Sequence, residues 1–248
     1  MVKDIVLGRE ERYDARELDC WSFLDAADVR DGLLINFGNL RKGYPFKMCG
    51  HEFALSESAY LCGEFSLNTE ICLAIQVELL KAKYGYVAKQ IIKMRNLEYI
   101  RPDWDEIRLQ WMFYVVWQKC LGNETFARML CALPEDAVII EDSTRYSDET
   151  CDFWGARNEE LWAVRKEKAE SVRLSHPEMG EDELKALVKQ EVNQINRHGV
   201  WRGGNNLGKI LKLCQLALVH GEEPGIDYDF LRSKEIYLFG ERLTFGEG

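Results

Sequence analysis

Apolar residues recur at helical spacing along much of the sequence. The strongest pattern runs over residues 104–121, and its centre, Trp111 to Trp117, is apolar on every side, so it is expected in the middle of the core. The same spacing predicts three further helices, over residues 56–65, 71–83 and 124–133. Ser56 stands where the first of these helices begins and is expected to cap it.

Short apolar runs predict three strands, over residues 33–37, 44–48 and 137–141. A turn at Cys49-Gly50 leads from the second run into residues 51–54, and the third run ends on a carboxylate, Glu141. A glycine-rich turn over residues 203–208 leads into a further helical pattern over residues 207–216. Short strands among longer helices are typical of an α+β fold.

Two segments differ from this pattern. Residues 156–199 are highly charged, yet Leu184, Leu187 and Val192 keep a helical spacing, which predicts one or two amphipathic helices inserted as an arm. Residues 1–30 are charged and weakly patterned, which indicates an N-terminal extension or an accessory helix. Because no repeat or linker divides the remainder, we expect a single, predominantly helical α+β domain over residues 31–248, with a helical insertion at about 156–199.

Composition narrows the class of protein. The chain of 248 residues carries a formal net charge of −10, which argues against a broad, non-specific grip on nucleic acid but leaves recognition of one modified nucleotide open. No apolar run approaches the roughly 20 residues of a membrane span, and no secretory signal opens the chain. The cysteines are scattered, as is typical of buried thiols in a reducing cytosol. The expected location is the cytoplasm, with no membrane partner.

Two motifs carry candidate chemistry. The segment Asp152-Phe153-Trp154-Gly155 places a carboxylate beside a large aromatic ring, and the turn Gly203–Gly208 can present backbone N–H groups and a helix dipole to a phosphate. Together they offer an acid, a stacking surface and a phosphate cradle, which suits a nucleotide-like sugar phosphate. The turn by itself is not specific, because it lacks the spacing of a Walker A or dinucleotide-binding motif.

These motifs belong to a longer series along the chain. In order, the series is Asn36-Phe37, Ser56-Glu57 opening a helix to Phe65, Trp104 with Trp111-Met112, Ile139-Ile140-Glu141, Asp152-x-Trp154-Gly155 and Asn205-x-Leu207-Gly208. In this order the motifs resemble the NADAR family, the YbiA-like N-glycosidases named for an association with NAD and ADP-ribose. The resemblance covers about residues 33–155 and 200–217, which leaves out the N-terminal extension and the arm.

The resemblance implies hydrolysis of the bond between a ribose C1 and an exocyclic amino nitrogen, without a cofactor. One substrate class in the family is ADP-ribose attached to guanine in nucleic acid, whose removal reverses the modification made by an ADP-ribosyltransferase toxin. The other class is the phosphorylated ribosylamino-pyrimidine intermediates of riboflavin synthesis. A non-catalytic sensor that binds ADP-ribose or NAD in the same pocket is an alternative of a different class.

Three carboxylates are the catalytic candidates, because cleavage of this bond needs a carboxylate near the sugar, a proton donor and a positioned water. Glu57, at the family's Ser-Glu, is the first choice, against the alternative of an acid that stabilises a helix dipole. Asp152 is expected to activate water or hold ribose hydroxyls. Glu141 ends a strand, where sites are common. Which residue is the acid and which the base stays open.

The expected substrate-binding residues combine aromatic, amide and glycine positions. Trp154 is expected to stack on a base. For Trp104 two roles stay open, stacking on a base or packing in the core. Asn205 and Gly208 are expected to shape the pocket wall. The full set is Asn36, Phe37, Trp104, Trp154, Gly155, Gly204, Asn205 and Gly208.

Two departures from the family bear on the substrate. Glu64 stands where many relatives have a lysine, which removes an expected phosphate contact and weakens the case for a small monophosphate substrate. The arm is larger than a compact enzyme needs and can cover a larger ligand, although its basic residues are interleaved with acids. Both favour ADP-ribosylated guanine over the riboflavin intermediates. The four histidines stand alone, without the spacing of metal ligands, so no metal is expected.

Overall fold

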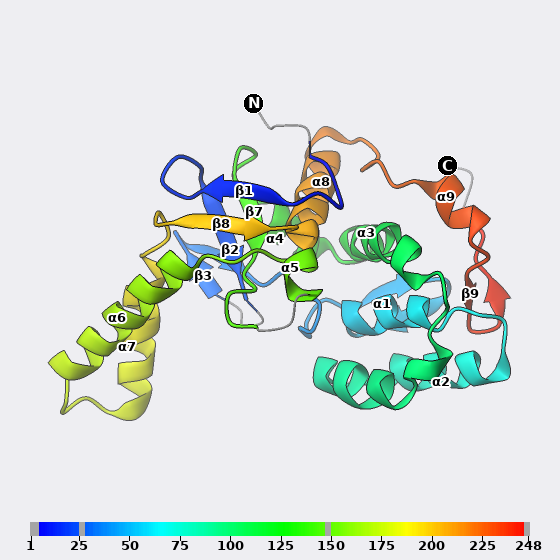
Figure 1. Cartoon of the computed structure of the whole chain (residues 1–248), viewed down its shortest axis with the longest axis horizontal. Coiled ribbons are helices and arrows are strands. Elements are labelled where there is room, and N and C mark those ends of the chain that lie inside the picture. Colours follow the sequence, from blue (N-terminus) through cyan, green and yellow to red (C-terminus); the bar gives the residue numbers. More distant parts are fainter. Residues whose placement is uncertain (1–4, 25–27, 147–149, 246–248) are drawn as a thin grey trace. The chain divides into compact units, whose positions relative to one another are not determined.

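A computed structural model describes residues 5–24, 28–146 and 150–245 of the chain. These residues form two compact units, one comprising residues 1–35 and 133–212 (unit 1) and the other residues 36–132 and 213–248 (unit 2). Helices predominate in the described chain and the strands are short, which confirms the predicted α+β class (Figure 1). The predicted domain bounds, residues 1–30 and 31–248, stay a prediction.

Unit 1 is built on pairs of short strands. The strand β1 (Glu11–Asp14) pairs antiparallel with β8 (Val200–Gly203), and β2 (Cys20–Phe23) pairs in parallel with β7 (Val138–Glu141). The strands β3 (Asp28–Arg30) and β4 (Leu33–Ile35) form a hairpin. The prediction of an extension or accessory helix over residues 1–30 is therefore wrong, because the described part of this segment supplies three strands whose partners include β7 and β8.

The helices of unit 1 include the predicted arm. After the short α5 (Thr150–Trp154), α6 (Glu159–Ser175) and α7 (Glu181–Asn193) lie side by side as a hairpin, which confirms the amphipathic pair predicted from residues 156–199 (Figure 1). The Asn158 side chain caps α6 by accepting a hydrogen bond of 3.0 Å from the N–H of Leu161. The helix α8 (Asn206–His220) begins in unit 1 and continues in unit 2.

Unit 2 is mainly helical. Its hairpin of β5 (Phe46–Met48) and β6 (His51–Phe53) turns at Cys49 and Gly50, both with positive φ, as predicted. The helices and remaining strands are α1 (Ser56–Glu64), α2 (Glu70–Leu80), the π-helix η1 (Val87–Lys93), the 3-10 helix η2 (Leu97–Tyr99), α3 (Trp104–Gly122), α4 (Glu124–Cys131), α9 (Tyr228–Ser233), β9 (Tyr237–Leu238) and β10 (Glu241–Arg242).

The core of unit 2 lies around α3. Trp111 is completely buried, and its indole N–H donates a 3.0 Å hydrogen bond to the carbonyl of Tyr60 on α1. A Cβ at Gly63 would lie 2.2 Å from the same indole, so α1 can approach α3 this closely only because position 63 is glycine. The predicted central helix over residues 104–121 is confirmed within one residue.

The start of α1 differs from its prediction. Ser56 is the first helical residue, the cap position is Leu55, and no side chain caps the helix, so the prediction that Ser56 is the cap is wrong. The hydroxyl of Ser56 is buried without a hydrogen-bond partner. By contrast, the Thr69 side chain caps α2 by accepting a hydrogen bond from the N–H of Cys72.

Lys119 on α3 is a cation inside the core of unit 2. Its side chain is 1% exposed, its Nζ lies 3.9 Å from the centre of the Phe126 ring, and it has no hydrogen-bond partner. Burial lowers the pKa of Lys119 from 10.5 to about 7. Between these values the unfolded chain binds a proton that the folded protein does not, so the free energy of unfolding rises with pH across this window.

We therefore expect Lys119→Met to stabilise the protein by roughly 1–3 kcal/mol at pH 7, because it removes an amine buried without a hydrogen-bond partner. The pH dependence that this amine contributes between about 7 and 10.5 should disappear with it. Urea denaturation of both proteins at pH 7, 8 and 9 measures the difference. A variant less stable than the wild type at pH 7, with an unchanged pH slope, would contradict this account of Lys119.

Candidate functional site

The predicted site residues divide between the two units. Unit 1 holds Glu141, Asp152, Trp154, Gly155, Gly204, Asn205 and Gly208. Unit 2 holds Asn36, Phe37, Glu57 and Trp104. Within unit 1 the predicted residues meet at one junction, where the end of β7 approaches α5 and the start of α8.

Asn205 holds this junction together. It has a positive φ of 46°, a backbone conformation that asparagine tolerates better than most residues. Its buried side chain donates a 2.8 Å hydrogen bond to the carbonyl of Ile139 and accepts one of 3.1 Å from the N–H of Glu141. One amide thus satisfies two backbone groups of β7 and fixes where α8 starts.

The glycines of the junction permit backbone segments to touch. A Cβ added at Gly155 would lie 2.6 Å from the carbonyl oxygen of Glu141, and one at Gly208 would lie 2.1 Å from that of Ile139. At Gly204 the nearest atom would be the carbonyl oxygen of Phe153, at 2.5 Å. These contacts are with backbone atoms, which cannot move aside, so close packing by itself requires glycine at all three positions.

Several of the donors predicted to bind phosphate at the glycine-rich turn form hydrogen bonds within the protein. The N–H of Gly204 donates to the carbonyl of Asp152 at 2.7 Å, and the N–H of Asn205 donates to that of Gly155 at 2.8 Å. The ammonium of Lys209 donates to the carbonyls of Val6 and Arg9. Two of the amides offered for phosphate binding are therefore engaged in building the junction, and a role of Gly204, Asn205 and Gly208 in substrate binding stays a prediction.

Asp152 lies at a cavity beside the junction. Its carboxylate pairs with the guanidinium of Arg157, its side chain is 37% exposed, and the Ser143 hydroxyl lies 3.4 Å away. The cavity has a volume of about 380 Å³ and is also lined by Arg202 and Gly203. The carboxylate of Asp152 is partly exposed and lies beside the guanidinium of Arg157, so a ligand in the cavity can reach it.

The aromatic and acidic neighbours of Asp152 are also half-buried. The Trp154 ring lies 5.0 Å from that of Phe153 in an edge-to-face arrangement. Glu141 ends β7, as predicted, and its side chain is half-buried. The predicted roles of Trp154 in stacking and Glu141 in catalysis are not tested by these contacts.

In unit 2 the helix α1 presents a face with two carboxylates. Glu57, Tyr60 and Glu64 are spaced by three and four residues, which places them on one side of the helix. Glu57 is 7% exposed, and its N–H donates a 3.1 Å hydrogen bond to the carbonyl of Asn39. The Tyr60 ring lies 5.1 Å from the ring of Trp104, so Trp104 packs against this face.

Glu64 is the most deeply buried acid of this face. Its side chain is 1% exposed, and one carboxylate oxygen accepts a 2.7 Å hydrogen bond from the ammonium of Lys93 on η1. The other oxygen, Oε2, is buried without a hydrogen-bond partner. Burial raises the pKa of Glu64, the charge of Lys93 opposes this rise, and the charge of Glu57 adds to it. Two acids in different environments on one helix can divide the roles of acid and base.

At the start of unit 2, Phe37 lies in the core and Asn36 is half-buried. The Phe37 ring packs edge-on against Phe126, at 6.1 Å between ring centres, and is 1% exposed. The Asn36 side chain donates to the hydroxyl of Tyr44 at 3.2 Å. The predicted contact of both residues with substrate stays a prediction.

Tyr60 and Glu64 of the α1 face, and Lys93 of η1, were not among the predicted site residues. The spacing of Tyr60 and Glu64 from Glu57 is visible in the sequence, so a helical projection of residues 56–65 would have placed all three on one side. Lys93 could not be found in this way, because it reaches Glu64 from a π-helix that no periodic pattern indicated.

The described residues show no further centre of reactive groups. They contain no group of three or more histidine, cysteine, aspartate or glutamate side chains placed to hold a metal ion. The cysteines whose side chains are described are free thiols. In the same residues, no helix combines the length and apolarity required to cross a membrane.

The junction of unit 1 yields a prediction for Gly208. We expect Gly208→Ala to destabilise the protein by about 2–3 kcal/mol, because the new methyl group would overlap the carbonyl of Ile139. Gly180→Ala is the matched control, since the nearest atom to a Cβ there is 3.9 Å away. Urea denaturation measures both variants. Equal stability of the two variants would contradict the close backbone contact.

The α1 face yields a prediction for Lys93. Lys93→Met should destabilise the protein by about 3 kcal/mol at neutral pH, because Glu64 loses its cation while it stays buried. The loss should be small near pH 4 and grow with rising pH, since the unfolded chain ionises its carboxyl before the folded protein does.

Arg95→Met is the control for Lys93→Met, because it removes only an exposed ion pair with Glu78 and should cost less than about 1 kcal/mol. Adding Glu64→Gln to Lys93→Met should restore most of the lost stability. Thermal unfolding from pH 4 to pH 8 tests these expectations. A double variant no more stable than Lys93→Met would show that Lys93 does not act through Glu64.

Comparison with known proteins gives a limited result. No family model and no curated protein matches the sequence. Among solved structures, the chain is similar to the NMR structure of the E. coli protein YbiA, with a TM-score of 0.48 and 16% sequence identity, over 84% of this chain and 92% of that chain. At this level of similarity the likeness transfers no activity to this chain, and its function has to be inferred from its own residues.

Proposed function

We propose that this protein is an N-glycosidase that hydrolyses the bond between a ribose C1 and an exocyclic base nitrogen, with ADP-ribosylated guanine as its substrate. The observation that carries the proposal is the acidic face of α1, where Glu57 and Glu64 lie on one side of a buried helix in different environments. The order of the sequence motifs, with Ser56-Glu57 at the start of this helix, supports it independently.

The chemistry assigns a distinct task to each acid. During hydrolysis a bond forms between the water oxygen and C1, and the bond between C1 and nitrogen breaks. The leaving amino nitrogen takes up one proton from an acid, and the attacking water gives up one proton to a carboxylate. Glu57, as a carboxylate, stabilises the positive charge that develops on the ribose. Glu64 is the proton donor, because its raised pKa keeps the proton on the carboxyl longer than on an ordinary glutamate.

The roles proposed for the residues of unit 1 are those predicted from the sequence. Asp152 is proposed to hold ribose hydroxyls or to activate water, and Glu141 is a further candidate acid. Trp154 and Trp104 are the proposed stacking surfaces, since stacking on an aromatic ring contributes about 1–3 kcal/mol per base. The engaged amides of the glycine-rich turn support a role in shaping the pocket wall rather than in direct phosphate binding.

One contact favours a second substrate class. Glu64 argues against a small monophosphate only if its negative charge is uncompensated, and the ammonium of Lys93 lies 2.7 Å from it. Because Lys93 balances any negative charge on Glu64, phosphorylated ribosylamino-pyrimidines, the intermediates of riboflavin synthesis, are the second candidate substrates. A protein that binds ADP-ribose without cleaving it is the alternative of a different class, and the following experiment separates all three.

The experiment measures release of ADP-ribose from an oligonucleotide that carries ADP-ribosylated guanine. The wild type should release it, and Glu57→Gln should be slower by at least about 100-fold, because a positioned acid or base contributes 10²–10⁴ in rate. Glu70→Gln is the matched control, since Glu70 is also an acid in the first turn of a helix but is exposed. Its rate should equal that of the wild type.

The other outcomes are equally defined. If the protein releases nothing from the oligonucleotide but cleaves ribosylamino-pyrimidine phosphates, the second substrate class is the correct one. Tight binding of ADP-ribose by wild type and Glu57→Gln, with no cleavage of either substrate, would contradict the proposed enzyme and favour the sensor. Equal losses in Glu57→Gln and Glu70→Gln would show that Glu57 acts on the helix dipole and not on the reaction.

A further inference from the structure

Unit 1 contains a second cavity, which is larger than the cavity beside Asp152. This groove has a volume of about 1030 Å³, at the upper limit for pockets of drug-sized ligands. One wall comes from β2, the hairpin of β3 and β4, and Pro134; the other comes from α7 and the segment after it. None of the predicted catalytic or substrate-binding residues lines it.

Arg30 forms the rigid floor of the groove. Its guanidinium lies 4.3 Å from the centre of the Trp21 ring and donates to the carbonyl of Cys20 at 2.5 Å and to the carboxylate of Asp19 at 3.2 Å. The indole N–H of Trp21 donates to the other oxygen of Asp19 at 2.7 Å. These contacts hold the three side chains in one arrangement, so the floor is pre-organised for a ligand.

One donor of Arg30 is not used by the protein. The Nε atom is buried without a hydrogen-bond partner, although the side chain is 10% exposed. The nearest carboxylate, that of Asp31, lies 3.7 Å away, which is too long for a hydrogen bond. A buried donor without a partner is costly, and an acceptor from a ligand in the groove would satisfy it.

The rim of the groove is positively charged. Lys189 on α7 and Arg197 after it add two cations to Arg30, against the carboxylates of Asp19 and Asp31. Burial lowers the pKa of Arg30, the charges of Asp19 and Asp31 oppose this fall, and the charge of Arg197 adds to it more weakly. In a chain whose net charge is −10, an excess of cations at one groove indicates an anionic ligand.

Between the cations the groove is lined by carboxamides. Gln190 and Asn193 come from α7, and Gln194 and Asn196 from the segment after it. A carboxamide both donates and accepts hydrogen bonds, which matches the edges of nucleic-acid bases. Cations for phosphates and amides for base edges are the combination that reads an unpaired strand, whose bases are accessible.

We propose that this groove binds a single-stranded segment of nucleic acid, with its phosphates at Arg30, Lys189 and Arg197 and its bases facing the carboxamides. The volume of the groove exceeds the need of one nucleotide and suits a short strand. This inference rests on the proposed function in one respect, because it adds that the ribose bond to be hydrolysed is carried by nucleic acid and not by a free nucleotide.

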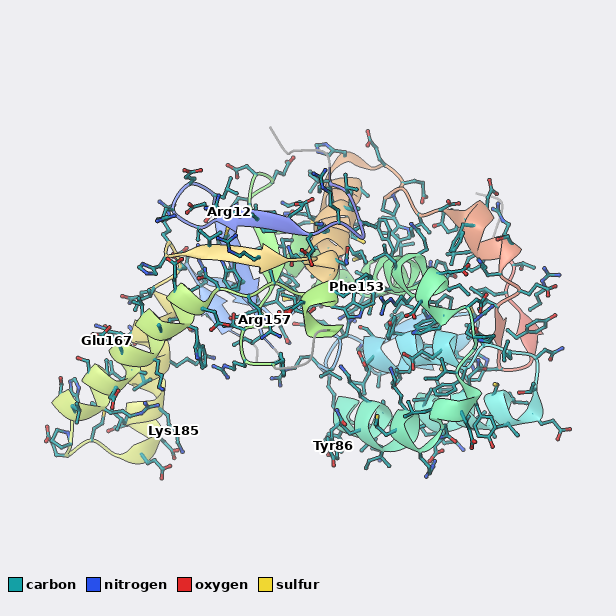
Figure 2. The ribbon with its side chains drawn as sticks, in the orientation of Figure 1. Arg12, Tyr86, Phe153, Arg157, Glu167 and Lys185 are labelled. Carbon is teal, nitrogen blue, oxygen red and sulfur yellow. The ribbon has the colours of Figure 1, made fainter. Side chains whose placement is uncertain are left out.

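The test is binding of a fluorescent, unmodified 12-nucleotide DNA or RNA strand, followed by anisotropy at several salt concentrations. The wild type should bind, and Arg197→Glu and Lys189→Glu should each weaken binding by about tenfold and reduce its salt dependence. Lys185→Glu is the matched control, because Lys185 lies on the same helix, is exposed, and does not line the groove (Figure 2). It makes the same change in charge and should alter the affinity by less than about twofold.

A variant that binds more tightly than the wild type cannot be explained by misfolding, so one such variant is included in the test. Asp31→Asn removes an exposed carboxylate at the groove and should tighten binding about threefold, since one opposing charge is lost. The inference is overturned if the wild type does not bind, if Lys185→Glu weakens binding as much as Arg197→Glu, or if a mononucleotide competes as well as the strand.

Failure of this inference is distinguishable from failure of the proposed function. Glu57→Gln should bind the unmodified strand with the affinity of the wild type, because Glu57 belongs to unit 2 and does not line the groove. Binding without hydrolysis of modified guanine would overturn the proposed function alone. Hydrolysis of modified guanine with no binding of the strand would overturn only the proposal that the groove binds nucleic acid.

Discussion

A helix that is buried along its whole length has to satisfy every polar group that it carries, and α1 is such a helix, because all of its residues from Ser56 to Glu64 are buried. The requirement is met at Glu64, where Lys93 supplies the countercharge, and at Glu57, whose N–H binds the carbonyl of Asn39. The hydroxyls of Ser56 and Ser58 and one oxygen of Glu64 are buried without a hydrogen-bond partner. These groups are where a substrate has something to contribute.

At the junction of unit 1, buried backbone groups are satisfied by a side-chain amide, and glycines permit the close contacts between backbone segments. Asn205 satisfies two backbone groups of β7, and Gly155 and Gly208 allow the backbone to come within contact distance. The same residues had been predicted to bind substrate. Their internal contacts explain why this chain needs them even before any ligand is considered, and Asp152 remains the residue of this group whose side chain is most accessible.

How much the sequence predicts depends on how local the cause is. The helix over residues 104–121 and the hairpin at Cys49-Gly50 were predicted closely, because apolar periodicity and turn chemistry lie within each segment. The strands β1 and β2 were missed, since each is four residues long and pairs with a strand more than 100 residues away. The candidate site behaved in a similar way. Glu57 was predicted from the Ser56-Glu57 motif of the family resemblance, whereas Lys93, which contacts Glu64 from another segment, was not predicted.

The central claim is that the bond broken is the one between ribose C1 and a base nitrogen. The most direct measurement is mass spectrometry of the products formed in ¹⁸O-labelled water from an oligonucleotide with ADP-ribosylated guanine, quenched early. The account predicts an oligonucleotide with unmodified guanine and an ADP-ribose that carries one ¹⁸O atom. Cleavage at the pyrophosphate, which would leave a phosphoribosyl group on the guanine, would contradict it.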